Sequence, residues 1–188
     1  VKVSNLILVD HDGQVVKGDY AVNRAGFVLH AAVHAEHPDI LAMCHAHTVH
    51  GVAYASLGRS LPPISQDACA FFEDHAVILE EAGQVAVETN AGINVAKSFK
   101  GITAAIHQNH GLLVASRHSI DAAAWRFMAL ERCCEQQLAL DASGHTPIEI
   151  PPERARYSRE HVGSEYIGWL AFQAVYEDIV QKSGTWFS

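Results

Sequence analysis

Hydrophobic positions follow a two-residue period in some stretches of the chain and a helical period in others. Near the start, two apolar runs flank Asp12-Gly13, a pair that favours a tight turn, so we expect a β-hairpin there. Apolar residues then recur at helical spacing from Val22 to His37, and Pro38 ends that helix. The apolar run "DILAMCHAH" at residues 39–47 follows, and it predicts a buried strand.

The remaining pattern alternates in the same way. Helices are expected over residues 48–58, 92–99, 119–140 and 158–181, and strands over residues 102–108 and 112–116. A proline-containing arm at residues 143–157 separates the last two helices. Alternating strands and helices predict a layered α/β domain, and we expect one such domain over residues 1–188.

Composition narrows the class of protein. The chain has a formal net charge of −8 and no run of Lys or Arg, which argues against a nucleic-acid or anionic-membrane partner. No apolar stretch reaches the roughly 18 residues of a membrane span, and four cysteines without CxxC spacing favour reduced thiols, so we expect a cytoplasmic protein. Val1 follows no Met, and "VSNLILVDHDGQVVKG" is typical of a domain interior. We therefore expect the chain to lack its native N-terminal segment.

Three histidines carry the candidate chemistry. His45 and His47 are two positions apart at the end of a predicted strand, so both imidazoles point to the same face. His110 lies in a predicted Gly turn between two later strands. Exposed histidines at a strand edge would be the plainer interpretation of each part alone. Together they fit a metal centre, because three neutral imidazoles leave a divalent ion its charge and an open position.

His50 extends the motif to H-x-H-x-x-H, which is similar to the two-metal motif of metallo-β-lactamase-type hydrolases. Val49 stands where that motif needs Asp, so a two-metal centre is not expected. His50 is then expected to line a pocket or to pack on the following helix. His30 and His34 are one helical turn apart and could face the sheet near the metal, although a role in the core or an interface is the default.

The chain resembles the class II aldolase/adducin family. The resemblance rests on "NRAGFVLHAAVHAEHPDILAMCHAHTVHGVAYASLG", "LPPISQDA", "QNHGLLVAS" and "AAAWRFMALERCCEQQLAL". It implies a three-layer α/β/α sandwich with a mixed, largely antiparallel central sheet. It also implies that His45, His47 and His110 are the metal ligands, with Zn expected and Fe(II) or Mn as alternatives.

The chain departs from the family's sugar-phosphate aldolases at one position. Those enzymes carry an acid/base Glu about 19 positions before HxH, where this chain has Gly26. The adducin head domain also has "AGF" there, but this chain retains both histidines of HxH. Candidates for the missing proton transfer are His30, His50 and Tyr166.

The resemblance implies a divalent-metal-dependent lyase acting on a small hydroxy or oxo acid by aldol-type cleavage or decarboxylation, with the metal stabilising an enediolate. It further implies a homotetramer, in which residues 143–188 would form an arm at a subunit interface. Two alternatives stay open. One is a non-haem Fe(II) oxygenase or decarboxylase on the same three histidines. The other is a non-catalytic, adducin-like assembly module.

Overall fold

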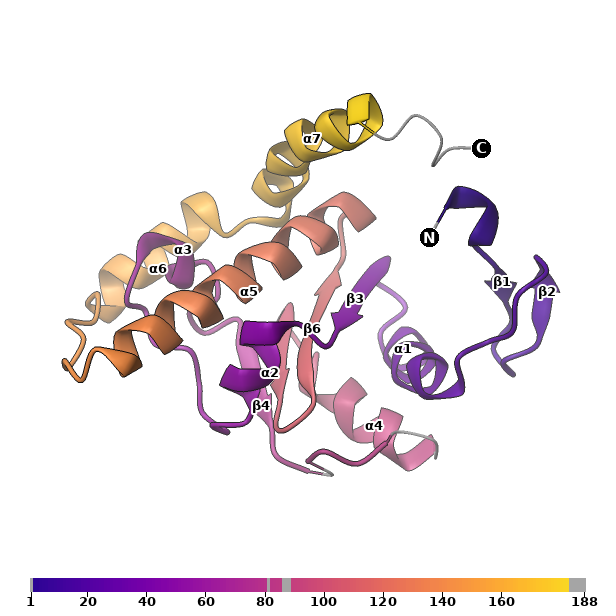
Figure 1. Cartoon of the computed structure of the whole chain (residues 1–188), viewed down its shortest axis with the longest axis horizontal. Helices are drawn as coiled ribbons and strands as arrows, with labels where there is room; N and C mark the ends of the chain where they lie inside the picture. The colour runs from indigo at the N-terminus through magenta and orange to yellow at the C-terminus, as the bar shows by residue number, and fades with distance from the viewer. Residues whose placement is uncertain (1, 81, 86–88, 183–188) are drawn as a thin grey trace.

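A computed structural model describes residues 2–80, 82–85 and 89–182. After a 3-10 turn at Val3–Asn5, the predicted hairpin is present as β1 (Leu8–Val9) and β2 (Val15–Lys17), which pair antiparallel. The hairpin stands apart from the central sheet, beside α1 (Figure 1). Among the described residues, no helix is long and apolar enough to cross a membrane.

Four strands form the central sheet in the order β3-β6-β5-β4. They are β3 (Ala42–Ala46), β4 (His75–Ile78), β5 (Ala104–His107) and β6 (Gly111–Ser116). β3 and β5 both pair antiparallel with β6, and only β4 and β5 run parallel. The sheet is therefore mixed and largely antiparallel, as expected.

Helices cover both faces of this sheet (Figure 1). One core lies between the sheet and two helices, α1 (Arg24–Glu36) and α4 (Thr89–Ser98). The second core lies on the other face, under α2 (Val49–Ala55), α3 (Gln66–Cys69) and α5 (Ile120–Ala142). Because the side chains of a strand alternate between faces, β5 and β6 contribute to both cores. The three-layer α/β/α sandwich is thus confirmed.

The C-terminal region differs from the expectation of an arm over residues 143–157 and one helix from 158 to 181. Two helices are present, α6 (Pro152–Val162) and α7 (Glu165–Lys182). α6 begins inside the expected arm because Pro152 occupies the first helical position, where proline is tolerated. The break falls at Gly163, where an added Cβ would lie 2.9 Å from the Ala70 Cα.

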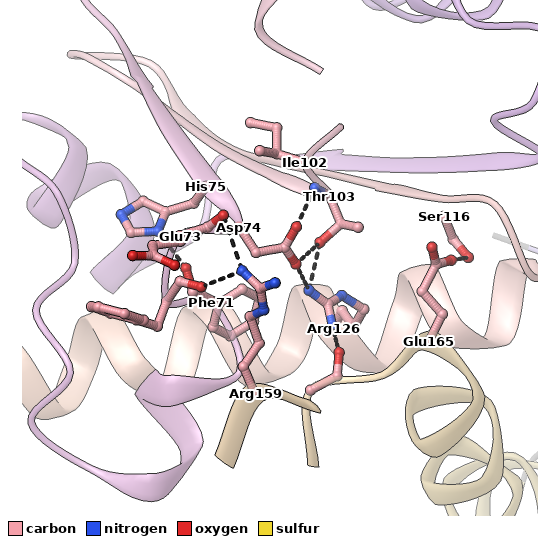
Figure 2. Close-up of polar contacts among 12 residues, drawn as sticks. Phe71, Glu73, Asp74, His75, Ile102, Thr103, Ser116, Arg126, Arg159 and Glu165 are labelled. Atoms are coloured by element: carbon pink, nitrogen blue, oxygen red, sulfur yellow. Dashed lines mark hydrogen bonds and ion pairs between the residues drawn. The ribbon is translucent and has the colours of Figure 1, made fainter. Parts of the chain in front are cut away.

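A buried ion pair joins these C-terminal helices to the sheet (Figure 2). The Arg126 guanidinium donates to the Asp74 carboxylate at 2.6 Å and also to the Gly163 carbonyl. Asp74 additionally accepts the Thr103 hydroxyl at 2.6 Å. At the start of α7, Glu165 accepts hydrogen bonds from the Ser116 hydroxyl and two backbone N–H groups beyond β6. The junction of α6 and α7 is therefore anchored to the sheet by polar groups.

Candidate metal centre

Strand pairing brings together histidines that are far apart in the sequence. His45 is paired with Leu113 in the β3–β6 ladder, and Ala46 with Leu112. The two strands run antiparallel, so the end of β3 lies beside the start of β6. His110 precedes that start directly, and His47 follows the end of β3. The three predicted ligands therefore meet where β3 ends and β6 begins.

The turn before β6 has a backbone suited to this approach. Asn109 adopts a left-handed conformation, with φ of 55°, which asparagine tolerates better than most residues. The His110 N–H closes the turn on the His107 carbonyl at 3.1 Å. At Gly111 an added Cβ would lie 3.0 Å from the Ala46 carbonyl oxygen, so glycine lets β3 come close.

The three rings converge around one point. Their centroids are 4.7 to 5.1 Å apart in pairs, and one ligand nitrogen from each ring lies within 4.8 Å of the other two. The His45 Nδ1 is 2.9 Å from the Leu112 carbonyl, which can only accept, so Nδ1 carries the proton and Nε2 is left as a ligand. The donor set and its spacing fit a divalent ion.

Burial keeps two of these imidazoles neutral. The pKa of His110 is lowered to about 4, mainly by burial and in addition by the neighbouring histidines His45, His107 and His47. Burial also lowers the pKa of His45, although the bond to the Leu112 carbonyl opposes the shift. Only neutral imidazole binds a metal ion, so at neutral pH both rings are in the form that a metal needs.

The histidines open onto a cavity of about 430 Å³ between α1, the sheet edge and the loop after β4. Its described lining is uncharged apart from the histidines and combines apolar groups with three amides: Asn23, Ala25, Gly26, Leu29, His45, His47, Val52, Gly83, Gln84, Val85, Asn109 and His110. Gly26 is thus at the cavity wall, as the resemblance implied. No carboxylate replaces the family's Glu among these described lining residues.

The three predicted proton-transfer residues are placed differently. His30 is half-buried on α1. Burial, and to a lesser extent electrostatic repulsion from His45 and His34, lowers the pKa of His30 to about 4. The His50 ring turns toward α5, with its Nδ1 3.1 Å from the Glu131 carboxylate. Tyr166 is exposed on α7 and stacked on Trp169. Within this chain, His30, His50 and Tyr166 are all absent from the described lining of the cavity.

Sequence reasoning missed two residues that support the centre. Glu131 of α5 accepts the N–H groups of His50 and Gly51, at 3.1 and 2.7 Å, and the Thr48 hydroxyl. It therefore caps α2, the helix that follows β3 and His47 in the chain. His107 contacts His110 from the end of β5. No sequence pattern pointed to Glu131, whereas the H-x-x-H spacing of His107 and His110 was visible.

Comparison with known proteins agrees with this architecture. Residues 1–138 match the family model described as the class II aldolase and adducin N-terminal domain. The solved structure of L-fuculose 1-phosphate aldolase from Glaciozyma antarctica is 34% identical, with a TM-score of 0.89, covering 99% of this chain and 72% of that one.

Two curated Streptomyces relatives are similar along nearly the whole chain. Decarboxylase NovR of Streptomyces niveus is 43% identical over 93% of this chain. The 4-hydroxy-3-prenylphenylpyruvate oxygenase/4-hydroxy-3-prenylbenzoate synthase of Streptomyces roseochromogenus is 42% identical over 96%. The chain spans 64% of the length of each of these relatives. With a family model matched over most of its length and this fold, the chain belongs to the class II aldolase and adducin family.

Proposed function

We propose that this chain forms the metal-binding part of an enzyme that releases CO₂ from a small oxo or hydroxy acid. The observation that carries the proposal is the convergence of three imidazoles on a cavity whose other described lining residues are uncharged. A divalent metal held by His45, His47 and His110 would supply Lewis-acid stabilisation of the enolate or enediolate that takes up the electron pair when CO₂ leaves the carbon next to a carbonyl group.

The cavity residues would bind and orient such a substrate. The side-chain amides of Asn23, Gln84 and Asn109 can donate hydrogen bonds to a carboxylate. Leu29 and Val52 offer apolar surface that excludes water and fits a hydrocarbon or aryl group. Because the described lining holds no Lys or Arg, it favours an oxo acid with an apolar body over a sugar phosphate.

Proton transfer limits which reaction fits this cavity. Aldol-type cleavage needs an acid/base group, and Gly26 cannot act as one. His30 interacts electrostatically with the ligand His45, and its lowered pKa makes it neutral at pH 7, hence a better proton acceptor than donor. Loss of a carboxyl group as CO₂ makes smaller demands on a protein acid, so decarboxylation fits these residues better than aldol cleavage.

An oxygen-dependent version of the same cleavage is the second candidate. It is favoured by the relative named as an oxygenase, which is as similar to this chain as the relative named as a decarboxylase. Three histidines without a carboxylate can hold Fe(II) as well as Zn. The two candidates differ in whether O₂ is consumed as CO₂ is released.

The assembly-module alternative is supported by the similarity to mouse alpha-adducin, which is 32% identical over 158 residues. The preserved histidine geometry argues for chemistry instead.

We further propose that the chain forms a homo-oligomer, with a tetramer expected, and that residues 143–188 lie at its interface. α7 supports this placement, since Tyr166 and Leu170 are at least half exposed on it. A cytoplasmic location stays a prediction.

The test is a parallel measurement of CO₂ release and O₂ uptake on the protein loaded with Zn, Mn or Fe(II). Aryl and alkyl 3-oxo acids are the substrates for the O₂-independent reaction, and 2-oxo and 2-hydroxy acids are those for the O₂-dependent one, with a chelator-treated sample as the control. CO₂ release that depends on metal and not on O₂ supports the metal-dependent decarboxylase. Matched CO₂ release and O₂ uptake with Fe(II) alone supports the oxygenase. Turnover that survives complete metal removal would exclude both, and no turnover with any metal would favour the assembly module.

A further inference from the structure

His107 is a buried polar residue that the proposed chemistry does not use directly. It ends β5, and its side chain is only 3% exposed. A polar side chain at such a depth is costly unless it is hydrogen-bonded. Both of its ring nitrogens have partners: Nε2 is 3.1 Å from the Glu80 carbonyl, and Nδ1 is 3.1 Å from the His110 Nδ1.

These two contacts determine the protonation of both rings. The Glu80 carbonyl can only accept, so the Nε2 of His107 carries the proton, and the Nδ1 of that neutral ring is an acceptor. The His110 Nδ1 must then donate to it. His110 is left with a lone pair on Nε2, the atom available to a metal. The Glu80 carbonyl thereby fixes the tautomer of His107 and, through His107, that of His110.

The same contacts connect the ligand to the cavity wall. Glu80 lies just before the loop whose Gly83, Gln84 and Val85 line the cavity. The Gly83 N–H donates to the Gln108 carbonyl at 3.2 Å, next to His107 in the chain. The loop and the ligand histidine are therefore held by adjacent residues at the end of β5.

We propose that His107 is a positioning residue that holds His110 in the tautomer competent to bind metal and ties it to the loop lining the cavity. This inference rests on the three-histidine centre of the proposed function. Partners of this kind are general supports of metal ligands, and their loss typically costs about 10- to 100-fold in metal affinity. Here the partner is a neutral imidazole, so it orients His110 without adding negative charge to the site.

Two substitutions separate the two contacts. In His107→Asn the amide oxygen can take the place of the ring Nδ1, which keeps the acceptor for His110 and loses the bond to Glu80. In His107→Gln the amide nitrogen can take the place of Nε2, which keeps the donor to Glu80 and loses the acceptor. His75→Leu is the matched control, because His75 is another sheet histidine bonded through both nitrogens, to Phe71 and Leu61, outside the metal cavity.

The measurements are Zn and Co(II) affinity by chelator competition and the His110 tautomer by ¹⁵N NMR of the metal-free protein. We expect His107→Asn to keep the Nδ1–H tautomer and affinity within about threefold of the unsubstituted protein. His107→Gln is expected to lose the single tautomer and about 10- to 100-fold in affinity. His75→Leu should lower thermal stability and leave both readouts unchanged.

A His107→Gln protein with an unchanged tautomer and affinity would overturn the inference, as would equal losses in the Asn and Gln variants. The tautomer is read without metal, so it decides the matter even if metal binds weakly. Failure of the proposed function would look different. The Asn and Gln variants would then differ as expected, while the unsubstituted, metal-loaded protein turned over no oxo acid.

Discussion

At the residue scale, the environment of each histidine ring determines what it can do. His45 has one nitrogen bonded to a carbonyl and one directed to the point where the three rings converge, whereas His50 is bonded to the Glu131 carboxylate of α5. His30 lies between these cases: it is half-buried, and among the described residues no hydrogen bond fixes its tautomer. The same residue type thus serves as a ligand candidate, a helix-end contact and a candidate base within one small region.

Stability should fall as the pH is lowered through the range in which unfolded histidine takes up protons. Burial lowers the pKa of His30 and of His110 to about 4 in the folded chain, against 6.5 as the ordinary value. Between about pH 6.5 and 4 the unfolded chain binds more protons than the folded one, so acid favours unfolding. Urea denaturation of the metal-free protein should show this loss, and His30→Leu should reduce it. A free energy of unfolding that is constant over that range would contradict the lowered pKa values.

Much of the site could be predicted from the residues, because its ligands lie in two short local motifs. Strand alternation placed His45 and His47 on one face, and the Gly turn placed His110 at a sheet end. The supporting residues could not be found in this way. Glu131 reaches Gly51 from 80 positions along the chain, and only the packing of α5 against α2 brings the two together.

At the element scale, α2 depends on a cap from another helix. Thr48 is at its N-cap position but makes no side-chain bond to the N–H groups there, and the Glu131 carboxylate accepts them instead. A carboxylate at a helix N-terminus also interacts favourably with the helix dipole. The orientation of α2 therefore depends on α5. The path of the chain from β3 through His47 to α2 depends on it as well.

Removing this cap should weaken both the fold and the metal centre. Glu131→Ala leaves buried N–H groups unpaired, which should lower the free energy of unfolding by roughly 2 to 3 kcal/mol. Metal affinity should fall as well, because α2 follows His47 directly. Glu135→Ala is the matched control, since Glu135 is more exposed and lies 3.9 Å from His50. Denaturation and metal titration of both variants measure these effects; equal behaviour of the two would argue against the cap.

The buried pair of Asp74 and Arg126 is expected to matter for stability alone. Asp74→Asn leaves a buried guanidinium without its counter-charge, which should cost roughly 3 to 5 kcal/mol. Glu73→Gln breaks the exposed pair with Arg156 and should cost no more than about 1 kcal/mol. Thermal unfolding should rank the variants in this order, with metal stoichiometry unchanged in both. Loss of metal from folded Asp74→Asn protein would show that the pair also supports the site.

Most elements were predictable from local sequence pattern, whereas β4 and the start of α6 were not. The helix capped by Ser119 and the strand before His45 follow from periodicity. β4 escaped prediction because its four residues, His75–Ile78, carry no alternation. It lies at the edge of the sheet and is specified by parallel pairing with β5, a contact that local pattern does not encode.

At the scale of the whole molecule, the sandwich leaves one helix face uncovered. α7 packs on α5 at Gly168, while Tyr166, Leu170, Tyr176 and Val180 are exposed. Aromatic and aliphatic side chains on one helix are typical of an interface.

If α7 contributes to the proposed homo-oligomer, Leu170→Asp should shift the protein to a smaller species in light scattering. The control is Asp178→Asn, a change at an exposed ion pair on the same helix, which should leave the mass unchanged. A Leu170→Asp protein that keeps its mass would argue against a role for this face in assembly.

The central claim is that one divalent ion binds to His45, His47 and His110 together. Its most direct test is metal content and affinity of the purified protein by elemental analysis and titration, for the unsubstituted chain and for each histidine changed to alanine. We expect about one ion per chain, and loss of that ion in each of the three variants while the fold is retained. His161→Ala, at an exposed histidine on α6, should bind as the unsubstituted chain does. Full metal content in folded His45→Ala or His110→Ala protein would contradict the account.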